Sequence, residues 1–298
     1  MPLTRRSALT LAAGLCAGAL ARPALADEAL PLLRREDYAV ARARFRTRLI
    51  RHGPAPDDVL PLDPPDGARR IAYRSDGRDL AAWLSVAPAG KSGTVPAVLV
   101  LHGGNVMSQD HWLLARPFIA AGFVAMVPTL RGENGQGGDY SGFYDETADV
   151  LAAAQALLAD PRVDSKRLYL AGHSIGGTQV LLAAIASPIF HAACALSGAP
   201  DASAFFRHFP EMIAFDTKDP AEFEMRSALC YATSFKCPLR LWHGSEEKRA
   251  ELPASLTVER AKAAGLDVAT AAVSGGHMTA LPEELAKSIA FFRERGAA

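Results

Sequence analysis

The sequence has no excess of charge of either sign and few cysteines. Among its 298 residues, Lys and Arg together number 32, as do Asp and Glu, so the formal net charge is zero. A protein that binds nucleic acid usually carries a clear basic excess, so this balance argues against such a partner. The four cysteines are too few for a disulfide-stapled fold, and their spacing with histidine is not typical of a zinc site. We therefore expect neither a nucleic-acid partner nor a metal or other cofactor.

The sequence also lacks an apolar run of the roughly 20 residues that a membrane-spanning helix needs. Its N-terminal apolar stretch, residues 8–20, follows adjacent Arg5 and Arg6 and precedes a small-x-small sequence that ends at Ala26. This order is typical of a cleaved export signal of the twin-arginine type. We expect residues 1–26 to be removed and the protein to work in the periplasm or outside the cell, without stable membrane insertion. A Sec-type signal or an uncleaved anchor is the alternative.

Removal of that signal would leave three cysteines. Cys194 lies within an apolar run and is expected to be buried as a small hydrophobic residue. Cys230 and Cys237 could form a disulfide in an oxidising compartment. The oligomeric state is not indicated by any feature of the sequence.

Apolar runs alternate with helical patterns from about residue 70 onward. Continuous runs at 97–101 and 123–127 are typical of strands buried on both faces, and residues 145–160 carry an apolar face at helical spacing. This alternation predicts a mostly parallel sheet wrapped by helices. Further strands are expected at 71–73, 80–86, 168–171, 192–196, 238–242 and 268–273, and further helices at 111–121, 178–187, 253–264 and 283–293.

Residues 27–69 predict an N-terminal helix followed by a proline-rich linker. The helix is expected near residues 34–51, where arginines interleave with apolar residues. A basic amphipathic helix of this kind could lie on a membrane surface, but docking against the body of the protein is the favoured interpretation. Residues 52–67 contain five prolines and are typical of a linker.

The motif Gly172-His173-Ser174-Ile175-Gly176 follows the apolar run 168–171 directly and precedes a helical stretch. In a strand–turn–helix context, Gly-x-Ser-x-Gly exposes a nucleophilic hydroxyl at the carboxyl end of a sheet. The glycines matter because side chains on either side would collide with neighbouring backbone. Ser174 is therefore the predicted nucleophile.

A serine nucleophile needs a base, and the base needs a third group to fix its tautomer. In this arrangement the order along the chain is serine, acid, histidine. Glu247 follows the predicted strand 238–242, and His277 follows the predicted strand 268–273 after two glycines. Both would lie at the carboxyl ends of strands, where Ser174 also emerges. We predict His277 as the base and Glu247 as the acid, with the adjacent Glu246 as the alternative acid.

Chemistry at a carbonyl group also needs hydrogen-bond donors for the developing oxyanion. One predicted donor is the backbone N–H of Ile175, which directly follows the nucleophile. The other is the N–H of Gly104 in the loop His102-Gly103-Gly104-Asn105, which follows the early central strand 97–101. His102 and His173 are expected to have structural roles.

With these residues in place, the chain resembles the α/β-hydrolase superfamily, and within it the prolyl-oligopeptidase-like and dienelactone-hydrolase-like group. The resemblance covers about residues 70–295. It implies an α/β-hydrolase fold of about eight strands flanked by helices, forming a catalytic domain over residues 70–298. The segments that carry it are 101–104, 130–133, 163–168, 172–177, 226–228 and 243–244. The acid in this group is usually aspartate, so Glu247 departs from the pattern.

The stretch between the strands 192–196 and 238–242 is long enough for a cap-like insertion near residues 198–236. Its aromatic residues are expected in part to fill the core and in part to line a substrate pocket. They are Phe205, Phe206, Phe209, Phe215 and Phe223.

The leading functional hypothesis is an exported serine hydrolase that cleaves a small-molecule carboxylic ester through an acyl-enzyme intermediate. Peptidases of the group commonly carry a β-propeller, for which the region before residue 70 is too short, so an esterase is favoured over a peptidase. A serine peptidase or amidase of the prolyl-oligopeptidase-like group is the second hypothesis. A catalytically silent periplasmic binding protein on the same fold is the third.

Overall fold

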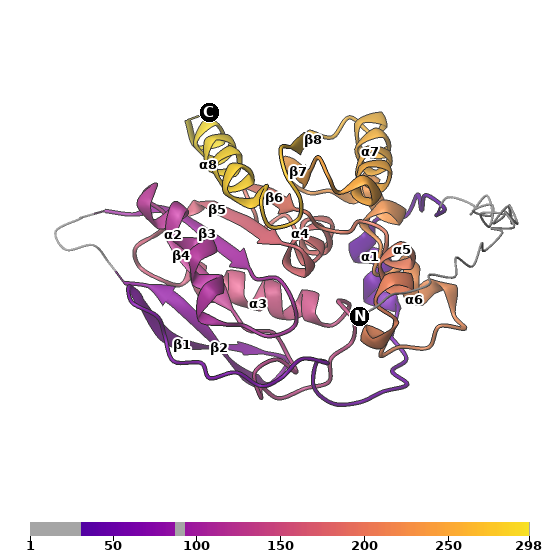
Figure 1. The fold of residues 1–298 in the computed structure, drawn as a ribbon, viewed down its shortest axis with the longest axis horizontal. Coiled ribbons are helices and arrows are strands. Elements are labelled where there is room, and N and C mark those ends of the chain that lie inside the picture. The colour runs from indigo at the N-terminus through magenta and orange to yellow at the C-terminus, as the bar shows by residue number, and fades with distance from the viewer. Residues whose placement is uncertain (1–30, 87–92, 298) are drawn as a thin grey trace, which may run out of the picture. The chain divides into compact units, whose positions relative to one another are not determined.

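Eight strands form one sheet in the computed structural model, which describes residues 31–86 and 93–297. The strand order is β1-β2-β4-β3-β5-β6-β7-β8 (Figure 1). Strands β1 (Ala68–Ser75) and β2 (Arg78–Ser85) are antiparallel, β2 is antiparallel to β4, and all later neighbours are parallel. The predicted α/β-hydrolase fold is thereby confirmed. The predicted export signal lies outside the described residues.

The predicted strands and helices are all present, with shifted ends. The other strands are β3 (Val95–Leu101), β4 (Val124–Pro128), β5 (Val163–His173), β6 (Ala192–Leu196), β7 (Leu239–Gly244) and β8 (Val268–Val273). The α-helices are α1 (Tyr38–Arg44), α2 (Trp112–Ala120), α3 (Glu146–Leu158), α4 (Ile175–Ala186), α5 (Ala202–His208), α6 (Pro220–Glu224), α7 (Lys248–Ala263) and α8 (Leu281–Ala297). The 3₁₀ helices are η1 (Gln109–His111), η2 (Pro210–Met212) and η3 (Ala228–Ser234).

The antiparallel pair β1–β2 turns at Asp76 and Gly77, whose φ angles of 45° and 79° are both left-handed. Two left-handed residues match the twist of the flanking strands, and Asp-Gly is a favoured sequence for such a turn. The turn fixes the register in which Ser75 pairs with Arg78.

The central strands are buried on both faces because helices cover each side of the sheet. On β3, Leu99 and Leu101 join the core beneath α3 and α4, whereas Val98 and Val100 join the core beneath α2 and α8. Alternate side chains point to opposite faces of a strand, so one apolar run serves both cores. Figure 1 shows the sheet with its labelled helices. The parallel strands end at one edge, and the loops that follow them build the candidate site.

The N-terminal helix is shorter than the predicted span of residues 34–51. Helix α1 begins after Asp37, whose side chain accepts a hydrogen bond from the Ala39 N–H. It ends at Arg44, because the backbone of the next residue, Phe45, is extended. Tyr38 is completely buried, and its hydroxyl donates to the Met225 carbonyl at 2.8 Å. The helix therefore docks against the insertion between β6 and β7, and residues 31–69 belong to the same compact unit as the rest of the described chain.

The insertion between β6 and β7 holds α5, η2, α6 and η3. Its centre is Arg226, whose guanidinium is fully buried and pairs with Glu222 at 2.5 Å. The same group donates to the Ser141 carbonyl at 2.6 Å and to the Thr47 hydroxyl at 2.7 Å. One arginine thus joins the insertion to the N-terminal segment and to the loop before α3, and burial lowers its pKa.

Most aromatic side chains of the insertion belong to the core. Phe206 and Phe215 are buried and pack edge to face with ring centroids 5.0 Å apart, whereas Phe209 is 44% exposed. The cysteines Cys194, Cys230 and Cys237 are all free thiols, so the possible disulfide is not formed. Cys194 is buried as predicted. No helix in residues 31–86 or 93–297 has the length and hydropathy to cross a membrane.

Candidate active site

Ser174 lies on a sharp turn between β5 and α4, with φ of 57° and ψ of −119°. The turn needs its glycines, because a Cβ atom on Gly172 would lie 2.6 Å from the Gly176 carbonyl oxygen. A Cβ atom on Gly176 would lie 2.4 Å from the Leu101 carbonyl oxygen. The Ser174 N–H donates to the Leu196 carbonyl at 2.9 Å, which anchors the turn to β6. The geometry is that of the predicted strand–turn–helix elbow.

The structure brings two further predicted residues together. His277, in the loop after β8, and Glu247, at the start of α7, are joined by a bond of 2.7 Å between Nδ1 and Oε1. The side chains are 44% and 17% exposed, respectively. Glu246, the alternative acid, makes no hydrogen bond to His277 in the part of the chain that the structure describes; its N–H donates to the Gly275 carbonyl at 3.0 Å.

The Glu247 carboxylate is held by donors on both oxygens. Oε2 accepts from the Ser197 hydroxyl at 2.6 Å and from the Gly244 N–H at 2.6 Å. Burial raises the pKa of Glu247, but the hydrogen bonds from His277, Ser197 and Gly244 outweigh it and lower the pKa to about 2. The bond to Glu247 raises the pKa of His277, against the opposing effect of partial burial. The pair therefore favours an ionised acid beside a more basic imidazole.

His173, directly before Ser174, holds the histidine loop in place. Its Nε2 donates to the His277 carbonyl at 2.9 Å, and the two ring centroids lie 4.6 Å apart. Burial lowers the pKa of His173, which favours the neutral ring. Among the described residues no hydrogen bond joins the Ser174 hydroxyl to His277. Such bonds are often long until substrate binds.

The loop after β3 runs alongside the nucleophile. A Cβ atom on Gly103 would lie 3.3 Å from the Ser174 Cβ, and Gly104 has a left-handed φ of 68°. Asp57, in the proline-rich segment, accepts from the Asn105 N–H at 2.9 Å. The loop is thus fixed from the outside by Asp57, while glycines allow its main chain to approach Ser174.

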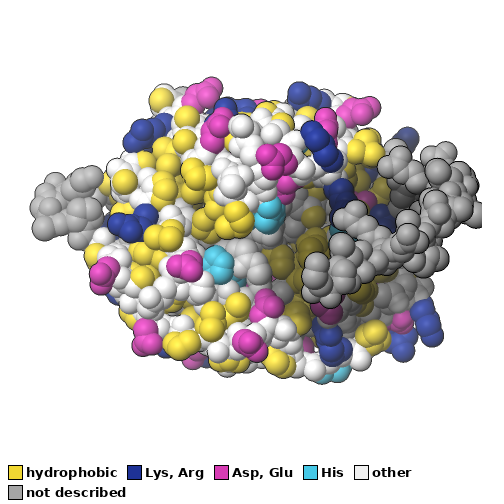
Figure 2. All heavy atoms as spheres, viewed as in Figure 1, with side chains coloured by type: hydrophobic (Ala, Val, Ile, Leu, Met, Phe, Trp, Pro, Cys, Tyr) yellow, Lys and Arg dark blue, Asp and Glu magenta, His cyan; other side chains and the backbone are white. Residues whose placement is uncertain are grey.

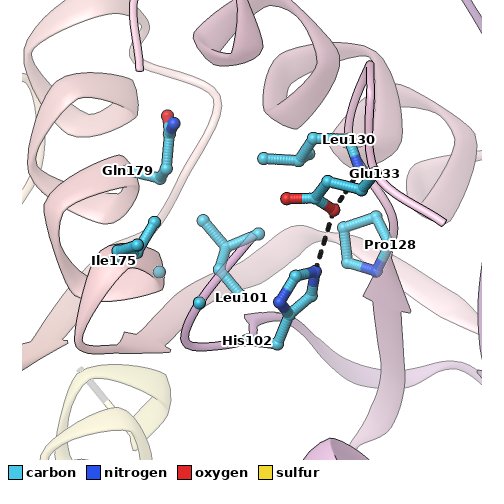
Figure 3. Close-up of a pocket in the computed structure, with 9 residues that line it drawn as sticks. Leu101, His102, Pro128, Leu130, Glu133, Ile175 and Gln179 are labelled. Carbon is cyan, nitrogen blue, oxygen red and sulfur yellow. Dashed lines mark hydrogen bonds and ion pairs between the residues drawn. The ribbon is translucent and has the colours of Figure 1, made fainter. Parts of the chain in front are cut away.

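The predicted oxyanion donors line one small pocket. Gly104 and Ile175 both contribute to its wall, together with Leu101, His102, Pro128, Leu130, Glu133, Gly176 and Gln179 (Figure 3). Neither of the two donor N–H groups has a backbone acceptor among the described residues. None of the lining residues belongs to the insertion near 198–236, so its aromatic side chains do not form this pocket.

Two of the residues that line the pocket, His102 and Glu133, contact each other. His102 Nε2 and Glu133 Oε2 lie 3.0 Å apart, and the same oxygen accepts from the Leu130 N–H at 2.7 Å (Figure 3). Burial lowers the pKa of His102, but the charge and hydrogen bond of Glu133 raise it overall. This contact links the loop after β3 to the loop after β4.

Exposed apolar side chains occur on the loop that holds His277 and on α7. Met278, next in sequence, is 64% exposed, and Leu252 on α7 is 63% exposed. Arg249 of α7 contacts His208 at the end of α5, so the insertion meets α7 there. On the face shown in Figure 2, histidine side chains lie near the centre of the view beside hydrophobic ones. In the ranges 31–86 and 93–297, no cluster of His, Cys, Asp or Glu is arranged to hold a metal ion.

Three residues near the site were not anticipated from the sequence. Ser197 and Asp57 are single polar residues without a motif. Glu284, whose Oε1 lies 3.3 Å from the Ser197 hydroxyl oxygen, is one glutamate in the first turn of a helix. The only available signal was position: Ser197 directly follows the strand 192–196, at the edge of the sheet where catalytic groups gather.

The family and sequence comparisons agree with this architecture. The family model of the prolyl oligopeptidase family matches residues 111–292. An uncharacterized peptidase, YuxL, of Bacillus subtilis (strain 168) is 30% identical over 200 residues, which cover 59% of this chain and 30% of the relative. The chain therefore spans less than a third of the length of this curated relative.

Solved structures share the fold at lower identity. The acylaminoacyl peptidase of Pyrococcus horikoshii superposes with a TM-score of 0.63 at 21% identity, covering 76% of this chain and 40% of the peptidase. A puromycin-hydrolyzing peptidase of Mycobacterium tuberculosis gives 0.64 at 22% identity, covering 79% and 41%. A putative dienelactone hydrolase from Klebsiella pneumoniae gives 0.59 at 16% identity, covering 76% and 98%.

Proposed function

Because this chain belongs to the prolyl oligopeptidase family, we propose that it is a serine peptidase or amidase that works through an acyl-enzyme intermediate. Ser174 is the nucleophile, His277 the general base and acid, and Glu247 the residue that orients His277. The observation that carries the proposal is the 2.7 Å bond between His277 Nδ1 and Glu247 Oε1, formed beside a serine on a strained turn.

The proposed reaction has two halves. His277 Nε2 accepts the Ser174 hydroxyl proton while the serine oxygen bonds to the substrate carbonyl carbon, and the N–H groups of Gly104 and Ile175 bind the resulting oxyanion. The imidazolium then donates its proton to the leaving amine or alcohol, and an acyl-serine remains. Water repeats the sequence: His277 takes one water proton, the hydroxide bonds to the acyl carbon, and the proton returns to Ser174 as the acid leaves.

An amide substrate is favoured over the ester expected from the sequence alone. The curated relative is described as a peptidase, and the similar solved structures include an acylaminoacyl peptidase and a puromycin-hydrolyzing peptidase. We propose a small peptide or amide with an apolar group near the scissile bond, because Met278, directly after His277 in sequence, exposes apolar surface.

Hydrolysis of an ester remains the second candidate function. The putative dienelactone hydrolase is matched over 98% of its length, and the same triad chemistry serves esters. Purified protein would be assayed side by side on aminoacyl p-nitroanilides and on p-nitrophenyl esters of matched acyl groups. We expect measurable kcat/KM on the anilides. Ester turnover with no anilide turnover would instead support the esterase.

A silent binding protein on the same fold is tested by active-site labelling. A fluorophosphonate probe should form a covalent adduct on Ser174 in folded wild-type protein and none in Ser174→Ala. Folded wild-type protein that remains unlabelled would support the silent alternative.

We also propose export by the twin-arginine route, carried by Arg5 and Arg6 before the apolar residues 8–20. Replacing both arginines by lysine should retain active precursor inside the cell. Undiminished periplasmic activity of that variant would contradict the proposed route.

A further inference from the structure

A second carboxyl group lies behind the acid that contacts His277. Glu284, in the first turn of α8, is completely buried. Its Oε1 lies 3.3 Å from the Ser197 hydroxyl oxygen, which is itself 2.6 Å from Glu247 Oε2. The other oxygen of Glu284, Oε2, is buried without a hydrogen-bond partner among the described residues. One hydroxyl group therefore separates two carboxyl groups.

The number of hydrogens at Ser197 decides how this contact works. A serine hydroxyl has one hydrogen to donate, and the shorter contact assigns it to Glu247. The Ser197 oxygen then turns lone pairs toward Glu284. This contact is favourable only when Glu284 carries a proton and donates it. An ionised Glu284 would face those lone pairs with one oxygen and leave the other unpaired inside the protein, which is strongly unfavourable.

Burial and the nearest negative charge also disfavour the ionised form of Glu284, against smaller opposing effects of Ser197 and His277. Glu247, from the loop after β7, places a negative charge near it, and His277, from the loop after β8, is the nearby group that can become positive. On α8 itself, Glu283 pairs with Lys287 at 3.4 Å on the exposed side of the helix. In the described part of the chain, no lysine or arginine bonds to Glu284. Burial and the charge of Glu247 raise the pKa of Glu284 to about 7.

We propose that Glu284 is a positioning residue of this site: it holds a proton and donates it to Ser197, which directs the Ser197 hydroxyl toward Glu247. The inference rests on the proposed function, because Glu247 and His277 are its acid and base. The hydrogen bonds then run in one direction from Glu284 through Ser197 to Glu247, which accepts from His277 on its other oxygen. When Glu284 loses its proton, its negative charge favours the imidazolium of His277, so the base becomes less available at a given pH.

The protonation of Glu284 can be measured without any substrate. Infrared difference spectra between acidic and alkaline buffer would be recorded for the wild type and for Glu284→Gln. The wild type should show a carboxylic-acid carbonyl band, lost through neutral pH, that the variant lacks. Glu146 is also buried with a pKa raised to about 7 by that burial, so its band should appear in both proteins. The absence of a band specific to Glu284 would overturn the proposal.

The effect on the site is measured by the pH dependence of kcat/KM. Glu284→Gln keeps a donor for Ser197 but carries no charge, whereas Glu284→Leu removes the donor. On the acidic side of the profile, kcat/KM of Glu284→Gln should fall at a lower pH than kcat/KM of the wild type. Glu284→Leu should lower kcat about fivefold, the typical effect of one lost hydrogen bond, and Glu284→Gln should lose less. Glu283→Gln, on the exposed side, should match the wild type.

The positioning role would be overturned if kcat/KM fell at the same acidic pH in the wild type and in Glu284→Gln. It would also be overturned if Glu284→Gln and Glu284→Leu lost equal amounts of kcat. A failure of the proposed function is seen differently, as wild-type turnover retained by Ser174→Ala. The infrared measurement still decides the protonation of Glu284 in that case, because it needs no catalysis. If Glu284→Leu does not fold, the comparison of the wild type with Glu284→Gln is sufficient.

Discussion

Replacing Glu247 by glutamine changes one atom but leaves no good arrangement of hydrogen bonds. Glu247 accepts from three donors: His277 on Oε1, and Ser197 and the Gly244 N–H on Oε2. A glutamine whose carbonyl serves the two donors must turn its NH₂ toward His277 Nδ1. The imidazole then carries its hydrogen on Nε2 and has no free nitrogen to accept the Ser174 proton. The opposite amide orientation places two N–H donors against each other at Gly244.

The magnitude follows from how strongly the site favours the charge. The pKa of Glu247 is about 2 against an ordinary 4.5, which corresponds to roughly 3 kcal/mol in favour of the ionised form. The imidazolium formed during the reaction also loses its counter-charge. We expect kcat to fall by about 10²–10⁴, or roughly 3–5 kcal/mol, the range for a triad acid that fixes the histidine tautomer.

The assay is kcat on a chromogenic substrate, with Glu246→Gln as the matched control. Glu246 is the adjacent glutamate and makes no bond to His277 in the described chain, so its variant should stay within about twofold of the wild type, as is usual for a surface substitution. Thermal melting would verify that both variants fold. A Glu247→Gln enzyme with near wild-type kcat would refute the reasoning, as would a larger loss from Glu246→Gln.

Three further predictions concern the turn that carries Ser174, the buried Arg226 and the base His277. Gly176→Ala would place a Cβ atom 2.4 Å from the Leu101 carbonyl oxygen and should destabilise the fold by roughly 3 kcal/mol or more. Gly137 has open space around it, so Gly137→Ala should not lower Tm. Equal Tm values for the two variants would contradict the packing of the turn that carries Ser174. Arg226→Met should lower the free energy of unfolding by roughly 3–5 kcal/mol, because the buried Glu222 carboxylate loses its charged partner. Arg48→Met removes an ion pair whose arginine is 78% exposed and should lower it by at most about 1 kcal/mol. Similar denaturation midpoints for the two variants would refute this. Because His277 must be neutral to accept a proton and its pKa is raised above 6.5, kcat/KM should fall as pH drops through a value above 6.5, and an inflection at or below 6.5 would contradict the pairing with Glu247.

The sheet could be predicted from the sequence because its central strands are buried on both faces. Strands such as β3 and β4 are continuous apolar runs between turn signals, so their existence and order follow from the pattern. The sequence predicts that β5 begins at 168, but it begins at Val163, because Val163 pairs with Val95 of β3 before the register shifts and Leu168 pairs with Ala97. The polar residues 164–167 lie at this register shift, which apolar periodicity does not signal.

The N-terminal segment shows a different limit. Its arginines and apolar residues suggested one helix over 34–51, but α1 ends at Arg44. Beyond it, the Arg48 N–H donates to Glu222 and Leu49 pairs with Phe215 of the insertion. These partners lie more than 160 residues away in sequence, and such tertiary contacts override local propensity.

For the site, motifs and chain order identified the residues that the structure brings together, Glu247 and His277. The supporting residues could not be predicted, because their roles arise only from convergence of distant loops. Glu284 is the clearest case. A glutamate in the first turn of a helix usually indicates a surface residue stabilised by the helix dipole, yet this side chain is buried behind Glu247.

The most direct test of the central claim is the turnover of Ser174→Ala. Purified wild type and variant would be compared on the anilide and ester substrates, with thermal melting to verify the fold. Removing the nucleophile of a serine hydrolase lowers kcat by several orders of magnitude, up to about 10⁶. We expect such a loss on every substrate that the wild type turns over, with Tm nearly unchanged. A folded Ser174→Ala protein that retains wild-type kcat would contradict it.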